Sequence, residues 1–437
     1  MNEEEKKVKK NVFRNKNFTL GFLGALVSNV GSLFYSFAVS FYILKITDNN
    51  ALIQGLYLAV GGVVFCVVTL FGGAIGDRFN KAKIMYICDY IKGAVIIVFT
   101  ILLMTVITST TAKVAALFVV TIIGNAIGGI FSPASSALLP QIVEEDMYQQ
   151  AQSYYSIMNS FQSIVGVVLA GILYTLIPIN ILFLVVGVCY ILSGVSEMFI
   201  KYESNFEKRD EKITMKAVLT DIKEGFKYVV SMRAILALLL CILFINFFFS
   251  PIFDNFAPYF IATDLTSSNY MFKDFIAPEM WNSFFSVAVG IGSLIMGIII
   301  SGAEQKEKYS GTIRWSMVAI TIVIGLIPAT YILFTNNIFG INIVLVSVII
   351  VLLIIGMLLV LVNVSTSTLM MKIVDKDKMG KVTSVSSIGS QGLIPVAMFL
   401  GGVAITYLGS AGLLIVCTAG LLITTLFLFF NKSIKEL

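Results

Sequence analysis

Apolar residues dominate the chain in long runs that are separated by short polar stretches. A helix of about 20 apolar residues crosses the roughly 30 Å hydrocarbon core of a bilayer, and most of these runs reach that length. We therefore predict an all-α integral membrane protein with twelve transmembrane helices. The predicted spans are 18–44, 51–76, 84–107, 114–135, 149–176, 181–200, 234–263, 280–301, 314–334, 341–366, 381–408 and 411–431.

Lys and Arg residues are distributed unevenly among the polar stretches. With the N-terminal tail inside the cell, 26 of the 30 Lys and Arg residues lie in cytoplasmic segments, as the positive-inside rule requires. Both termini are therefore predicted to be cytoplasmic. The net charge of +5 reflects this topology rather than nucleic-acid binding. The charged N-terminus predicts a cytosolic tail followed by a first span, not a removed signal peptide.

The longest polar interruption, residues 201–233, divides the spans six and six. Its second part has apolar residues at helical spacing with Lys and Glu between them, which predicts a basic amphipathic helix at the cytoplasmic interface. The predicted organisation is a cytosolic tail, a six-helix half, a linker, a second six-helix half and a short tail. Their bounds are 1–17, 18–200, 201–233, 234–431 and 432–437.

An internal repeat supports this division. With a shift of 231 residues, Leu138 matches Leu369 and Ile142 matches Ile373, each pair at the exit of a corresponding span. The shift is about half the chain, and the partners run in the same direction across the membrane. Two parallel six-span halves are a transporter architecture, with substrate bound between them.

The turn between the second and third spans reads GGAIGDRFNKAKIM over residues 72–85. Gly73 and Gly76 would let span two pack closely against a helix of the other half. Asp77 can accept hydrogen bonds from a neighbouring helix N-terminus, while Arg78 and Lys81 keep the turn in the cytosol. We interpret the turn as a gate that holds the halves together in one state. The alternative is an ordinary basic loop.

This turn resembles the loop signature of the major facilitator superfamily: Gly, three residues, Asp-Arg, one residue, Gly, then basic residues. Asn80 stands where the family usually has glycine, and asparagine tolerates the left-handed backbone that a tight turn can need. The equivalent turn of the second half, residues 297–311, has no Asp in register, so an asymmetric gate is expected. The resemblance implies that spans one, four, seven and ten line a central cavity.

Three further stretches are similar to the drug-antiporter branch that includes macrolide efflux pumps and enterobactin-type siderophore exporters. They are 133–146 at the exit of span four, 221–228 before span seven and 390–395 in span eleven. Antiporters of the superfamily often carry a Gly-Pro pair in span five. Here residues 166–171 read GVVLAG without the proline, which weakens antiport by analogy.

Ionisable groups inside the membrane are costly and are functional candidates by default. Asp254 lies in span seven between two prolines, where broken helix is expected nearby, and it could carry a proton. The alternative places it in outside water. Asp89 lies in span three one turn before Lys92, so a structural ion pair is the favoured interpretation and proton coupling the alternative. Glu197 and Glu279 stand at span ends and are interpreted as interfacial.

Uncharged polar residues also interrupt the spans, and span seven is rich in phenylalanine. The resemblance places several of them along the cavity, whereas a small-residue packing stripe is the alternative for the serines. The phenylalanines would form an apolar, adaptable wall that suits amphipathic molecules better than sugars. The cavity candidates are Asn29, Ser32, Tyr35, Ser36, Asn125, Asn159, Gln162, Phe248, Asn255 and Asn363.

Several kinds of chemistry are missing from the sequence. Histidine is absent, and the five cysteines all lie in apolar runs without metal-ligand spacing. A nucleophile motif and a P-loop are also absent, so neither an enzyme nor direct ATP use is expected. We expect no metal and no cofactor other than an ion gradient, namely H⁺.

The sequence therefore predicts a secondary active transporter that exports amphipathic small molecules by alternating access and proton antiport, as in macrolide or multidrug efflux and antibiotic resistance. The alternatives are a dedicated siderophore or metallophore exporter, a lysolipid flippase and, less favoured, a transport-inactive receptor. The expected location is the bacterial cytoplasmic membrane. One chain supplies both halves, so we expect a monomer whose partners are its small-molecule substrate and the lipid bilayer.

Overall fold

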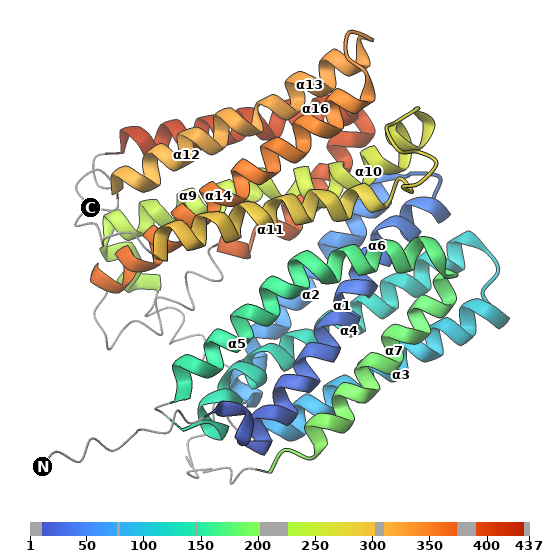
Figure 1. Cartoon of the computed structure of the whole chain (residues 1–437), viewed down its shortest axis with the longest axis vertical. Helices are drawn as coiled ribbons and strands as arrows, with labels where there is room; N and C mark the ends of the chain where they lie inside the picture. The colour runs from blue at the N-terminus through green and yellow to red at the C-terminus, as the bar shows by residue number, and fades with distance from the viewer. Residues whose placement is uncertain are drawn as a thin grey trace, which may run out of the picture. The chain divides into compact units, whose positions relative to one another are not determined.

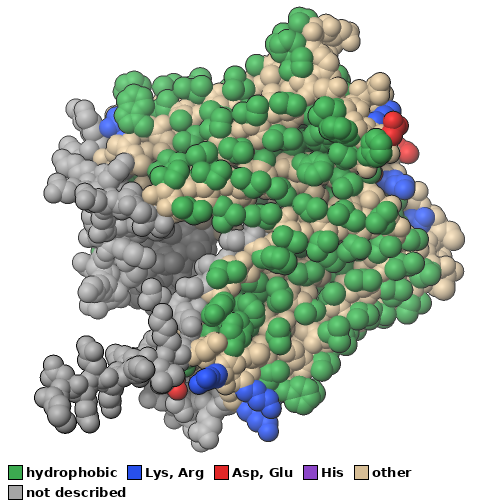
Figure 2. Space-filling view, viewed as in Figure 1, with side chains coloured by type: hydrophobic (Ala, Val, Ile, Leu, Met, Phe, Trp, Pro, Cys, Tyr) green, Lys and Arg blue, Asp and Glu red, His purple; other side chains and the backbone are tan. Residues whose placement is uncertain are grey.

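The computed structural model describes residues 11–76, 79–144, 147–201, 226–301, 310–373 and 390–431. Long helices make up almost all of this part of the chain (Figure 1). Eleven stretches of the described residues are long and apolar enough to cross a membrane, which confirms the all-helical membrane class. Hydrophobic side chains cover the visible faces of the helices, and charged side chains gather at their ends (Figure 2).

The helices separate by their contacts into two compact units. Unit 1 comprises Met1–Ala38, Val64–Gly166 and Ile177–Lys212, and unit 2 comprises Val39–Val63, Val167–Leu176 and Ile213–Leu437. The outer ends of spans one, two and five thus contact the second half of the sequence. The six-plus-six division of the chain stays a prediction, because the paired stretch 374–389 and residues 202–225 of the linker lie outside the described residues.

Unit 1 is built on the pairing of two helices that are far apart in sequence. α3 (Lys81–Thr105) lies beside α7 (Ile179–Met198) and also contacts α4 (Thr110–Ile142) (Figure 1). α1 (Lys16–Ile46) follows a short 3₁₀ turn, and α2 (Ala51–Gly76) enters the unit with its second half. α5 (Tyr148–Phe161) continues through the π-helical turn η3 (Gln162–Gly166) into α6 (Val167–Leu176).

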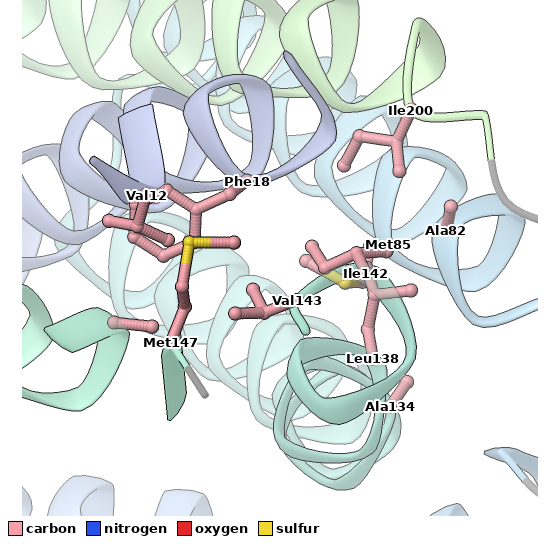
Figure 3. Close-up of a cluster of buried hydrophobic side chains, with 11 residues drawn as sticks. Val12, Phe18, Ala82, Met85, Ala134, Leu138, Ile142, Val143, Met147 and Ile200 are labelled. Atoms are coloured by element: carbon pink, nitrogen blue, oxygen red, sulfur yellow. The ribbon is translucent and has the colours of Figure 1, made fainter. Parts of the chain in front are cut away.

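A buried apolar cluster joins the helices of unit 1 at the end where α1 and α3 begin and α4 ends (Figure 3). Phe18, Ala134 and Ala151 at its centre are completely shielded from solvent. The cluster explains why α4 runs to Ile142, beyond the predicted span end at residue 135: the extra turns bury apolar side chains. Its members are Val12, Phe18, Ala82, Met85, Ala134, Leu138, Ile142, Val143, Met147, Ala151 and Ile200.

Unit 2 contains the remaining helices. α9 (Arg233–Pro251) continues through a π-helical turn, η4 (Ile252–Phe256), the short α10 (Ala257–Phe260) and a second π-helical turn, η5 (Ile261–Leu265). α11 (Met280–Ser301) lies beside α14 (Ile341–Ile373), and α9 lies beside α16 (Ile394–Phe430) (Figure 1). α12 (Ser310–Ile324) and α13 (Leu326–Thr335) together form the ninth span.

The last two predicted spans follow each other without a loop in the structure. α16 covers residues 394–408 of the eleventh predicted span and nearly all of the twelfth, as two helices that meet at a kink at Gly409, with φ 72° and ψ 175°. Glycine adopts a positive φ much more readily than other residues do. A sharp bend at Gly409 therefore replaces the loop expected at residues 409–410. The bend explains why eleven long stretches correspond to twelve predicted spans.

Candidate functional site

The turn after α2 is only partly described. Gly73 and Gly76 belong to the last turns of α2, whereas Asp77 and Arg78 lie outside the described residues. Lys81 begins α3 and is buried. The gate interpretation of these five residues therefore stays a prediction.

Asn80 has a different role from the one expected at that turn. Its φ of −60° and ψ of 115° are extended rather than left-handed, and its side chain accepts a hydrogen bond from the backbone N–H of Lys83 at 3.0 Å. Asn80 is thus the N-cap of α3, which satisfies an N–H that the helix itself cannot. The expectation of a left-handed asparagine was wrong, because the helix begins directly at the turn.

Another glycine makes the close helix contact in this region. A Cβ at Gly72 would collide with the backbone carbonyl of Gly129 on α4, and a Cβ at Gly129 would lie 2.9 Å from the backbone nitrogen of Thr69. The inner half of α2 therefore packs backbone to backbone on α4, within unit 1. The doublet at residues 128–129 was the available signal, since paired small residues permit such approaches.

Three polar candidates form an exposed stripe on α1. Asn29, Ser32 and Ser36 are exposed and recur at intervals of three and four residues, which places them on one helix face. Tyr35 is half-buried, and its ring centroid lies 5.7 Å from that of Phe183 on α7. An exposed polar stripe inside a span is typical of a water-lined surface, because polar side chains are unfavourable in lipid.

The other candidates of unit 1 differ in exposure. Asn125 on α4 is half-buried, and its amide donates to the carbonyl of Thr121 in its own helix at 2.9 Å. Asn159 on α5 is exposed. Gln162 is buried at the start of η3, and among the described residues its Nε2 has no hydrogen-bond partner.

In unit 2 two neighbouring candidates point in different directions. Asp254 is exposed, whereas Asn255 is fully buried and its amide donates to the carbonyl of Met398 on α16 at 3.1 Å. Both lie in η4, directly after Pro251, so the broken helix expected around Asp254 takes the form of a π-helical turn. π-helical turns are frequent at functional sites. Asn363 on α14 is exposed.

Phe248 lies in the wall of an apolar pocket between α9 and α16 with a volume of about 390 Å³. The one hydroxyl in its wall, that of Thr424, donates to the carbonyl of Gly420 within α16 at 2.8 Å. The pocket therefore offers apolar surface and no free hydrogen-bond donor. Its walls are formed by Leu240, Cys241, Phe244, Phe248, Gly420, Ile423, Thr424 and Phe427.

A buried polar cluster surrounds Asp89 in unit 1. Asp89 on α3 is 1% exposed, and Glu197 on α7 is 0% exposed. Lys92 lies over the rings of Phe131 and Tyr190, with its Nζ 5.6 Å and 5.4 Å from their centroids. The sequence interpretation of Glu197 as interfacial was wrong, since its position near a helix end does not reveal the neighbours that cover it.

Metal binding finds no support in the part of the chain that the structure describes. No group of three His, Cys, Asp or Glu side chains there could hold a metal ion.

Many long apolar helices with polar residues placed inside them define a multi-pass membrane protein. The family model of the Major Facilitator Superfamily matches residues 22–398, so the chain belongs to this superfamily. It is a transporter of the cell membrane, in a superfamily whose members move small molecules.

Curated relatives agree with this membership. The uncharacterized MFS-type transporter YvqJ of Bacillus subtilis (strain 168) is 23% identical over 400 residues, which are 90% of this chain and 87% of the relative. The uncharacterized MFS-type transporter YkuC of the same organism is 23% identical over 309 residues, covering 68% of this chain and 67% of the relative.

Solved structures share the fold. The crystal structure of a bacterial homologue of the iron transporter ferroportin in an inward-facing state has a TM-score of 0.70 and 14% identity. It covers 96% of this chain and 98% of its own. At this identity the similarity concerns the fold alone and says nothing about the substrate.

Proposed function

We propose that the chain is a proton-driven exporter of amphipathic small molecules that works by alternating access. The observation that carries this proposal is the apolar pocket between α9 and α16. Its volume of about 390 Å³ falls within the usual range of small-molecule sites, and aromatic and aliphatic side chains bind varied apolar groups without fixed hydrogen bonds. An apolar part of the substrate would bind in this pocket.

The polar end of such a substrate needs a different surface. Asp254 lies six residues after Phe248 along the same span, about 9 Å at 1.5 Å per residue, and its side chain is exposed. An amphipathic molecule suits this combination better than a sugar, which needs many hydrogen bonds along its whole length.

A lysolipid flippase is the second candidate function. It is favoured by the pocket wall, in which the Thr424 hydroxyl is already bonded to Gly420, so the wall suits an acyl chain equally well. Both candidates use proton antiport and alternating access, and they differ in the molecule that is moved.

The test is substrate-induced collapse of a pH gradient in everted membrane vesicles containing the full chain. The panel contains macrolides, lipophilic cations, chelators and lysolipids. Collapse with macrolides or lipophilic cations supports drug export, collapse with lysolipids alone supports the flippase, and collapse with chelators alone supports metallophore export. Collapse with none of these compounds would contradict proton-driven export of amphipathic molecules.

A matched pair of variants tests the pocket itself. A Cβ at Gly420 would collide with the ring of Phe248, so Gly420→Ala should push that ring into the pocket and lower transport. At Gly297 on α11 a Cβ meets nothing within 4 Å, so Gly297→Ala is the control for an added helix methyl group. Equal transport by the two variants would remove the pocket from the proposal.

The gating turn has its own test. Asp77→Asn should abolish transport without reducing the amount of protein in the membrane, since the turn would hold the halves in one state. Transport at the normal rate would leave the turn as an ordinary basic loop.

A further inference from the structure

Two carboxyl groups inside unit 1 lack the partners that buried carboxylates need. The side chains of Asp89 and Glu197 are 1% and 0% exposed. Among the described residues, Oδ2 of Asp89 and both carboxyl oxygens of Glu197 have no hydrogen-bond partner. A buried ionised carboxylate without hydrogen bonds is strongly unfavourable, whereas the neutral acid is much less so.

The helices around these carboxyls pack closely against one another. A Cβ at Gly24 on α1 would lie 2.9 Å from Cγ of Glu197 and 3.3 Å from Oγ of Ser193. A Cβ at Gly93 on α3 would lie 2.8 Å from the carbonyl oxygen of Gly187 on α7. Because the three backbones approach this closely, the carboxyls are held at fixed positions with little room for rearrangement.

Hydrogen bonding around Ser193 gives the Asp89 carboxyl little support. Its hydroxyl donates to the carbonyl of Gly24 at 2.9 Å, and its oxygen is also hydrogen-bonded to the carboxyl of Asp89. A serine hydroxyl has a single proton to donate. Ser193 cannot donate to Gly24 and to Asp89 at the same time, so while it donates to Gly24 the Asp89 carboxyl receives no proton from it.

The charges near the two carboxyls indicate how many protons the cluster needs to be neutral. Lys92 is close enough for its charge to act on both carboxyls, and it is the one cation among the described side chains that do so. Two carboxylates and one ammonium carry a net charge of −1, and one proton makes the cluster neutral. The other titratable groups that act on the cluster are neutral in their ordinary state: Cys88 on α3, Tyr155 on α5, and Cys189 and Tyr190 on α7.

A polar connection leads from the cluster to the surface of α1. The ammonium of Lys92 lies over the ring of Tyr190, whose hydroxyl is hydrogen-bonded to Ser32. Ser32 is exposed and belongs to the polar stripe with Asn29 and Ser36. Tyr190 therefore contacts the cluster with its ring and the polar stripe of α1 with its hydroxyl.

We propose that Asp89 and Glu197 form one proton-binding site, in which the two carboxyls share a single proton and Lys92 balances the remaining charge. Loading transfers a proton from water to a carboxylate oxygen, and unloading returns that proton to water. The use of this proton for export rests on the proposed function, whereas its binding is a property of the chain without substrate.

Infrared spectroscopy of the purified full chain in lipid nanodiscs tests the binding directly. The readout is the C=O stretching band of a protonated carboxylic acid, identified by its shift in D₂O and titrated with pH. Asp89→Asn and Glu197→Gln should each abolish the titrating band, because one carboxylate with Lys92 is neutral without a proton. Lys92→Met should increase the band about twofold, since neutrality then needs two protons. Asp254→Asn and Asp264→Asn, which remove acids of unit 2, should leave it unchanged.

Several results would overturn the proposal. The band could persist in both acid variants of unit 1, be lost only in Asp254→Asn, or stay unchanged in Lys92→Met. A band that is displaced by Na⁺ but not by choline would make the cluster a sodium site. Should a single acid variant fail to fold, the charge-balanced double variant Glu197→Gln with Lys92→Met replaces it. There the remaining Asp89 should give a band about half as strong as that of Lys92→Met, and a band as strong as that of Lys92→Met contradicts the shared site.

The vesicle assay separates this proposal from the proposed function. A band that follows these expectations, together with no pH-gradient collapse for any compound, would retain the proton site and remove proton-driven export. Collapse that persists at the normal rate in both Asp89→Asn and Glu197→Gln, with the band lost, would retain export and place its coupling proton elsewhere.

Discussion

Asp89 and Asp254 are both carboxyls inside spans, and the two units accommodate them in opposite ways. In unit 1 the α3–α7 pair is regular and tightly packed, and Asp89 is buried near a lysine. In unit 2 the helix changes to a π-helical turn after Pro251, and Asp254 is exposed while its neighbour Asn255 is buried. The comparison shows two solutions to the cost of charge in a membrane: neutralisation inside a close helix pair, and exposure at an irregular turn.

The strongest test of this comparison is proton coupling. In the vesicle assay, Asp89→Asn should reduce substrate-induced proton movement by about tenfold or more, within the range of typical coupling energies between two ligands. Asp254→Asn should have a smaller effect, because an exposed carboxyl is not required to hold a proton for the helices to pack. The opposite ranking would move the coupling proton to η4. Membrane-inserted protein is quantified for each variant as the control.

Helix packing gives the second test. Gly93→Ala places its Cβ 2.8 Å from the backbone carbonyl of Gly187, which cannot move alone, so the free energy of unfolding should fall by about 1–3 kcal/mol. Gly420→Ala meets the Phe248 ring, which can turn into the adjoining pocket, and should cost less than about 1.5 kcal/mol. Thermal unfolding in detergent measures both. The control is Gly124→Ala, since a Cβ at Gly124 meets nothing within 4 Å.

Two asparagines compare a bond between helices with a bond inside one helix. Asn255→Ala removes the donor to Met398 from a fully buried position and should destabilise the protein by about 1 kcal/mol. Asn125→Ala removes a bond to the carbonyl of its own helix and should cost less. The same unfolding assay checks the order. An equal loss in both would indicate that the bond from Asn255 contributes nothing beyond a local contact.

The smallest expected effect concerns the N-cap of α3. Asn80→Ala should lower the free energy of unfolding by about 0.5 kcal/mol, the low end for a cap, because the bond is exposed, and Asn80→Gly by only a few tenths of a kcal/mol. The reason is that alanine cannot accept the hydrogen bond from Lys83 N–H, whereas glycine leaves this N–H open to water. Asn80→Asp keeps the cap and serves as the control. Equal stability of the alanine and aspartate variants would show that the cap contributes nothing.

Candidate residues illustrate how far the sequence reaches. Asn29, Ser32 and Ser36 were chosen as polar residues inside span one, and the structure shows all three exposed on one helix face. Asn255 is the same type of residue as Asn29, but it is buried and its amide donates to α16. Residue type and helical spacing predict which side chains share a face, but the partner of that face depends on a helix that is far away in sequence.

The sequence by itself determined the class, the membrane spans and the superfamily. In lipid each backbone must satisfy its own hydrogen bonds, so about 20 consecutive apolar residues specify a helix with little tertiary information. The burial of Glu197 and Asp89, the bend at Gly409 and the close contacts at Gly24 and Gly93 were decided only by the tertiary structure. Apolar residues occupy every face of each span, so the sequence pattern does not reveal which faces meet lipid and which meet another helix. That choice depends on how closely two backbones can approach.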